Sequence, residues 1–110
     1  MDGILDIFSI HLFNAQSMAA NAVSSSQEIS NCSLYSIQFS WTAASGTLLV
    51  STTASNDNVI FTTVDSFIPS AGAGNRMLNV EKAGYKYFRV EITQTGGAGS
   101  LTALANGKNN

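Results

Sequence analysis

The amino-acid sequence predicts an all-β protein, namely an antiparallel β-sandwich of seven to eight short strands. Apolar and polar residues alternate with period two in the stretches 34–42 and 85–93, which is the pattern of strands that bury one face. Clusters of Gly, Ser, Asn and Asp separate such stretches at intervals of roughly 8–12 residues, as they do in sandwiches and barrels. A closed barrel is therefore the alternative architecture.

The stretch 34–42 is the first of the two clear strands. Tyr35, Ile37, Phe39 and Trp41 lie on one face, with polar residues between them. A half-buried strand turns its apolar face inward. We therefore predict that these four side chains, Trp41 included, lie in the core.

The stretch 85–93 carries the second clear pattern. One of its faces is apolar and is expected in the core: Phe88, Val90 and Ile92. Tyr85 and Tyr87 fall on the opposite face. Because tyrosine combines an apolar ring with a polar tip and often anchors interfaces, we expect these two to contact something outside the domain.

The remaining elements are shorter. Further strands are expected at 47–54, 59–64, 76–80 and 100–105, with one or two more within 4–13. Residues 55–58 and 96–99 form predicted turns, and the segment 65–75, which holds the only proline, is a predicted connection. The segment 15–23 favours a strand and turn over a short amphipathic helix. We expect residues 1–110 to fold as a single domain.

The composition excludes several classes of function. The net charge is −2 and the five cations form no basic cluster, which argues against a nucleic-acid partner. No apolar run reaches the roughly 18 residues of a membrane helix, so no membrane partner is expected. The N-terminal segment carries Asp2 and Asp6 where a secretion signal needs positive charge, which predicts folding in a host cytoplasm.

Charged residues are scarce. They make up 11% of the chain, against about 25% in an ordinary soluble domain. Ser, Thr and Asn together supply 34 of the 110 residues. Because hydroxyl and amide groups leave water at a lower free-energy cost than ions, this surface is suited to contact with other protein copies. We therefore expect a homo-oligomer within a larger assembly.

Two long segments resemble a domain that recurs in bacteriophage virion proteins. They are YSIQFSWTAASGTLLVSTTASNDN and GAGNRMLNVEKAGYKYFRVEITQTGGAGSLTA, within the region that begins at Asn31. Such domains are similar to discoidin or galactose-binding-like jelly rolls in capsid-decorating and tail-associated proteins. The resemblance implies a jelly-roll-like sandwich and a location in the virion. Phe61 stands where that pattern often has Trp, which argues against stacking on a sugar at this position.

The sequence indicates no catalytic, cofactor-binding or metal-binding site, and so no enzyme and no cofactor. His11 has no marked nucleophile nearby, and Cys32 has no cation close in sequence that would activate its thiol. One histidine and one cysteine cannot build a zinc site. Asp57 lies in the turn Ser-Asn-Asp-Asn, and one carboxylate provides too few oxygens for Ca²⁺.

We therefore predict a non-enzymatic structural protein of a phage virion, most simply a capsid decoration or cement protein that binds coat protein. The alternative is a tail-associated or carbohydrate-binding module for attachment to a host surface. A glycan-binding module should place an exposed aromatic ring or a polar pocket among the loops 43–46, 55–58 and 70–75.

Two regions are expected to make the contacts. The segment 1–14 is either a docking arm or the first strand, and it holds more apolar residues than one strand can bury on one side. The second region is the polar face of the strand near 85–93. The predicted interface residues are Ile4, Leu5, Ile7, Phe8, Leu12, Phe13, Tyr85, Tyr87 and Arg89.

Overall fold

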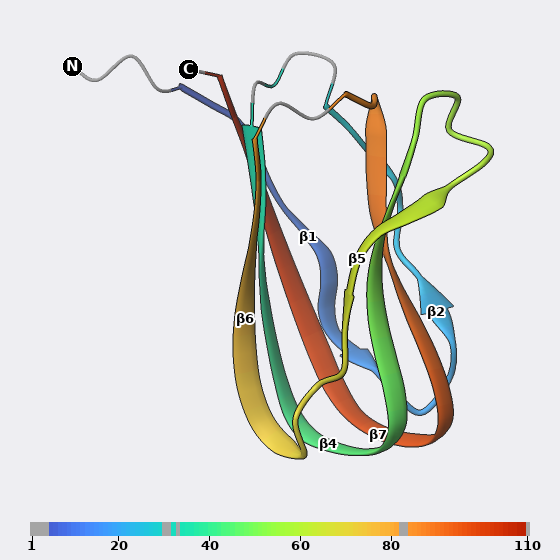
Figure 1. The fold of residues 1–110 in the computed structure, drawn as a ribbon. Helices are drawn as coiled ribbons and strands as arrows, with labels where there is room; N and C mark the ends of the chain where they lie inside the picture. The colour runs from blue at the N-terminus through green and yellow to red at the C-terminus, as the bar shows by residue number, and fades with distance from the viewer. Residues whose placement is uncertain (1–4, 30–31, 33, 82–83, 110) are drawn as a thin grey trace.

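A computed structural model describes residues 5–29, 32, 34–81 and 84–109 of the chain (Figure 1). The elements of this part are all strands, and hydrogen bonds join them into one antiparallel network. They are β1 (Leu5–Ser17), β2 (Ala22–Val23), β3 (Gln27–Glu28), β4 (Leu34–Ser55), β5 (Thr62–Phe67), β6 (Gly72–Glu81) and β7 (Tyr87–Asn109). The described part contains no helix long and apolar enough to cross a membrane.

The two longest strands bend in the middle. β4 has 22 residues and β7 has 23, and each follows a U-shaped course through the bottom of the molecule in Figure 1. In β4 the backbone angle φ is +54° at Ala43 and +81° at Gly46, and in β7 it is +61° at Gly96 and +105° at Gly99. This left-handed backbone turns the chain sharply, while the pairing between the two strands resumes beyond the bend.

The bends place the two halves of each long strand in different layers. The first layer contains β6, residues 34–42 of β4, residues 100–109 of β7, and β1, in that order. The second layer contains β5, residues 47–55, residues 87–95, and the pair β2 and β3. The predicted all-β, antiparallel, sandwich-like fold is therefore confirmed.

The predicted core strands are confirmed, but not as short separate elements. Residues 34–42 and 47–54 are the two halves of β4, and residues 85–93 and 100–105 fall largely in the two halves of β7. The expectation of short strands was wrong here. The turn-forming residues at the bends change the direction of the chain without ending its pairing: Ser45 still lies opposite Ala98.

The aromatic side chains of β4 join the two layers. Tyr35, Ile37, Phe39 and Trp41 are all buried, as predicted. The Tyr35 ring stacks on Phe88 of the second layer, with ring centroids 4.2 Å apart. Stacked and tilted aromatic pairs contribute beyond the area that they bury. The core is therefore centred on these contacts between the layers.

Small residues on β7 make room for these rings. Ala103 lies directly opposite Phe39, and Gly107 lies opposite Tyr35. A side chain at Gly107 would collide with the Phe8 ring, since its Cβ would stand 2.0 Å from Phe8 Cε2. Large and small residues thus lie opposite each other on neighbouring strands, which favours close packing of the two layers.

The structure corrects the limits of two strands. β5 begins at Thr62, three residues later than the predicted stretch 59–64. β6 begins at Gly72, inside the segment 65–75 that was predicted to be a connection. Pairing with β4 extends the strand through residues that favour loops by themselves, because tertiary context overrides weak local preference. The segment 15–23 contains the end of β1, a bend and β2, and no helix.

Candidate interaction surface

The sandwich leaves four strand edges along its two sides. In the described part of the chain, β1 and β6 each pair on one side only in the first layer, and β5 and the β2–β3 pair do so in the second. An edge strand presents unpaired N–H and C=O groups, which can pair with another chain. The regularity of each edge therefore decides where such a contact can form.

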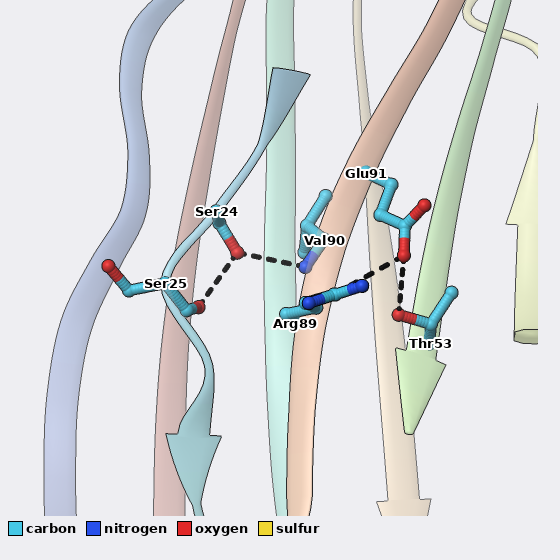
Figure 2. A network of polar contacts seen from close by, with 6 residues as sticks. All are labelled: Ser24, Ser25, Thr53, Arg89, Val90 and Glu91. Atoms are coloured by element: carbon cyan, nitrogen blue, oxygen red, sulfur yellow. Dashed lines mark hydrogen bonds and ion pairs between the residues drawn. The ribbon is translucent and has the colours of Figure 1, made fainter. Parts of the chain in front are cut away.

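The β2–β3 edge is interrupted at the three serines 24–26, of which Figure 2 shows Ser24 and Ser25. Val23 lies opposite Glu91, but Gln27 lies opposite Phe88, so the register shifts by one residue within 24–26. The Ser24 N–H donates to the Val90 carbonyl at 2.9 Å, and the Ser24 hydroxyl accepts the Val90 N–H at 2.9 Å. A side chain thus replaces a backbone acceptor at this bulge.

Two other edges are irregular as well. In β5, Asp65 lies opposite Thr52 and Thr63 lies opposite Thr53, so Val64 has no partner in the ladder. In β1, the register with β7 shifts at three places. Bulges twist an edge and break the regular spacing of its free backbone groups. These edges are poor templates for a straight partner strand.

The β6 edge is regular. From Gly74 to Glu81 every residue pairs with β4 without a shift in register. Most of this strand is exposed, and Met77 keeps 53% of its surface accessible. Eight residues of continuous ladder exceed the length of a typical strand, which is about five to six residues. β6 is thus the edge with the most regular register in the described part of the chain.

An ion pair closes the space between the layers next to this edge. Arg76 of β6 donates to Asp65 of β5 through Nη2, with the Nη2–Oδ2 distance 3.3 Å. The guanidinium also lies over the Phe67 ring, 5.0 Å from its centroid. Because both partners are partly exposed, the pair contributes little to stability. It covers the edge of the core between β5 and β6.

Arg89, predicted to contact a partner, is engaged within the domain. Its guanidinium lies 3.8 Å from the centre of the Phe61 ring, and its Nε lies 3.3 Å from Glu91 Oε2. The same carboxylate oxygen accepts a hydrogen bond of 3.0 Å from the Thr53 hydroxyl (Figure 2). This cluster offsets one charge with the other on the outer face of the second layer.

Tyr85 faces the core, which corrects the expectation that it points away from it. Its hydroxyl lies 2.6 Å from the hydroxyl of Tyr35, and the two rings meet edge to face. Burial, helped by this hydrogen bond, raises the pKa of Tyr35 well above its usual value. Tyr87 was predicted to contact a partner together with Tyr85 and Arg89, and it is half-buried on the second layer.

The N-terminal interface residues divide into four groups. Ile4 lies outside the described residues, and for Leu5 and Ile7 only the backbone, in β1, is described. Phe8 and Leu12 are half-buried and pack against the core. Phe13 is 5% exposed and belongs to the core, so the prediction that it contacts a partner was wrong. The described residues of 1–14 form the first strand, which was one of the two alternatives.

The loop between β4 and β5 presents apolar side chains that sequence reasoning placed in a strand. Val59 and Ile60 are 77% and 71% exposed. The Asp57 carboxylate fixes the loop: its Oδ1 accepts the N–H groups of Ile60 at 3.0 Å and of Val59 at 2.9 Å, and the Ser55 hydroxyl at 2.7 Å. These hydrogen bonds, that from Ile60 first, lower the pKa of Asp57 to about 2.

An open hollow lies beside this loop. It has a volume of about 420 Å³ and is lined by Ala54, Ser55, Asn56, Asp57, Ile60, Thr62, Val64 and Tyr85. Of the three loops expected to surround a polar pocket, two meet, because Ala44 pairs with Gly72 at the bend. The third does not join them, since Ser55 lies at the far end of β4 opposite Tyr87. Only the loop 55–58 contributes to the hollow.

The residues that could carry chemistry are dispersed. His11 is exposed on β1, opposite Leu104. Cys32 is half-buried, and burial raises the pKa of its thiol, which disfavours the reactive thiolate. Within the described residues, no group of three His, Cys, Asp or Glu side chains is placed to hold a metal ion.

Comparison with known proteins shows a likeness in fold. No protein-family model and no curated protein matches the sequence. Among solved structures, the chain is similar to one described as "Bacillus endospore appendages form a novel family of disulfide-linked pili". The TM-score is 0.61 at 14% sequence identity, over 97% of this chain and 88% of the other. The comparison thus shows a likeness of fold between two β-rich chains.

Proposed function

We propose that this protein is a non-enzymatic structural subunit that assembles with further copies of itself through the edge of β6. The regular β6 ladder from Gly74 to Glu81 carries this proposal. An added strand would continue that ladder and satisfy its free N–H and C=O groups. Because the other described edges are bulged, the favoured partner for β6 is β6 of a second copy, in a two-fold antiparallel contact.

The surface beside this edge supports the same proposal. Asn75, Met77 and Asn79 are exposed along β6, and none of them carries a charge. Proteins usually protect an edge strand with outward lysines, prolines or bulges. The outward residues of β6 before Glu81 include none of these. Arg76 is a charged residue on the inward face of the same stretch, and it is already paired with Asp65, so a partner strand would bury little uncompensated charge here.

Two settings fit such a subunit. The sequence resemblance to virion domains favours a capsid decoration or cement protein, or a tail accessory, that also binds coat protein. The fold likeness to a protein of endospore appendages, described as disulfide-linked pili, favours a subunit of a filament. In both settings the protein would bind its neighbours by burying surface area against them.

Light scattering of the purified full chain over a range of concentrations tests the proposal. We expect the mass to rise from monomer to at least a dimer as the concentration increases. Met77→Lys adds a charge at the edge and should shift this transition to at least about tenfold higher concentration, because a lysine on an edge strand opposes pairing. Electron microscopy of the same samples would distinguish closed dimers from filaments.

Gln38→Lys is the matched control. Gln38 is exposed and lies opposite Met77 on the neighbouring strand β4, in the interior of the same layer. It should leave self-association unchanged, since it carries the same charge on the same face but away from the edge. A monomer at all concentrations, or equal weakening by both variants, would refute pairing through β6.

A further inference from the structure

The hollow beside the β4–β5 loop has the mixed lining of a ligand site. Ala54, Ile60 and Val64 supply apolar surface, and Asn56, Asp57 and Thr62 supply polar groups. Its volume of about 420 Å³ falls within the range of about 300–1,000 Å³ that is typical of small-molecule sites. The polar groups determine which ligand it suits.

The Asp57 carboxylate is held rigidly, and only one of its two oxygen atoms accepts hydrogen bonds from described residues. Its Oδ1 accepts three hydrogen bonds from its own loop. No described residue donates to Oδ2. The hydroxyl of Ser55 stiffens the same turn by accepting the N–H groups of Asp57 and Asn58. One fixed and unoccupied acceptor is therefore available at the wall of the hollow.

Tyr85 adds a donor. Tyr35 is 1% exposed, and its only described hydrogen-bonding partner is the Tyr85 hydroxyl. A buried hydroxyl whose proton lacks an acceptor is costly. Tyr35 therefore donates to Tyr85, and Tyr85 keeps its own proton for a partner outside the core.

Two more polar groups of the lining are uncommitted. The Asn56 amide and the Thr62 hydroxyl make no side-chain hydrogen bond within the described part of the chain. Each can both donate and accept. Together with Asp57 and Tyr85, which hydrogen bonds within the chain hold in place, they surround an apolar wall with donors and acceptors.

We propose that this hollow binds a neutral saccharide, with Asp57, Asn56, Thr62 and Tyr85 engaging its hydroxyl groups. An anionic ligand is disfavoured because the described lining contains no cation and one carboxylate. A metal ion needs more than one carboxylate. A purely apolar ligand would strip water from four polar groups without replacing it. A sugar ring presents hydroxyls on its rim and C–H groups on its faces, which matches both parts of the lining.

Nuclear magnetic resonance titration of the full chain, with backbone amides as the readout, tests this site. The probes are glucose, galactose, mannose, rhamnose, N-acetylglucosamine and lactose, with inorganic phosphate and CaCl₂ as separate arms. At least one of the sugars should give saturable shifts confined to residues 54–64 and Tyr85. Thr62→Val should weaken that binding roughly five- to tenfold, the effect of one lost hydrogen bond. Asn56→Ala provides a second variant on the exposed loop.

Thr63→Val is the matched control, because Thr63 is exposed on the same strand but does not line the hollow. Its sugar affinity should equal that of the unmodified chain. Absence of saturable shifts with all six sugars would overturn the proposal, as would binding of phosphate or Ca²⁺ alone at these residues. Equal affinity of the Thr62→Val variant would also overturn it.

Discussion

The β6 edge and the β2–β3 edge lie on opposite sides of the sandwich and differ in how their backbone groups are arranged. Each has one row of backbone groups that no described strand satisfies. On the β2–β3 side the three serines 24–26 break the ladder, and Ser24 uses its own hydroxyl to satisfy Val90. On the β6 side the ladder continues without interruption. The difference indicates that one edge is protected against pairing and the other is left open to it.

The largest expected effect concerns the fit of β6 against β4. A Cβ at Gly74 would stand 2.6 Å from Cζ2 of the Trp41 ring, and that ring is held by a hydrogen bond of 3.0 Å from Nε1 to the Ser70 carbonyl. Gly74→Ala should therefore reduce the free energy of unfolding by about 1–3 kcal/mol through overpacking. Urea denaturation measures it, with the exposed neighbour Asn75→Ala expected to change little.

If Gly74→Ala proved neutral, Trp41 would not fix the position of β6. The regular register of this edge would then depend on the backbone ladder alone.

The next effect concerns the interrupted edge. Ser24→Ala removes the acceptor of the buried Val90 N–H, and we expect a loss of about 1–2 kcal/mol in the free energy of unfolding. Ser25→Ala is the control, because only the Ser25 carbonyl takes part in the network. Denaturation curves of the two variants should differ clearly. Identical curves would show that the Ser24 hydroxyl does not hold this edge in place.

A smaller effect is expected at the ion pair beside β6. Arg76→Gln removes the partner of Asp65, and both groups are partly exposed, so the free energy of unfolding should fall by less than about 1 kcal/mol. Raising the salt concentration should weaken the original protein toward the variant, because salt screens exposed pairs. A loss of several kcal/mol would mean that Arg76 acts mainly by covering Phe67.

The smallest effect near neutral pH involves Tyr35, which lies in the first layer and stacks on Phe88 of the second layer. The folded protein keeps its phenol protonated because burial raises its pKa, whereas the unfolded chain loses that proton near pH 10. The contribution of Tyr35 to stability is therefore constant below about pH 10 and falls as the pH rises further, since the unfolded state then binds fewer protons. Denaturation at increasing pH measures this. Unchanged stability well above pH 10 would contradict it.

The sequence predicted the faces of the strands better than their limits. The period-two alternation identified the core residues of β4, because a strand that buries one face has an apolar residue at every second position. These residues are Tyr35, Ile37, Phe39 and Trp41. The continuity of β4 through Gly46 was not predictable, because turn residues can bend a strand as well as end it. The length of β6 was missed, since Gly72 and Gly74 favour loops until pairing with β4 fixes them.

The candidate surfaces were less accessible to sequence reasoning. The regularity of an edge depends on the register with its partner, which no single strand encodes. The run of serines 24–26 was a usable signal for a bulge, and the turn Ser-Asn-Asp-Asn correctly marked the loop beside the hollow. The orientation of Tyr85 was not predictable, because its ring follows the position of Tyr35 on a strand 50 residues away.

Hydrogen exchange of backbone amides, measured at low and high protein concentration, tests the central claim most directly. If copies pair through β6, alternate amides between Gly74 and Glu81 should become protected as the concentration rises, while those of β2 and β3 exchange unchanged. Alternation is expected because every second residue of an edge strand directs its N–H outward. New protection confined to residues 22–28, or no concentration dependence in β6, would contradict the account.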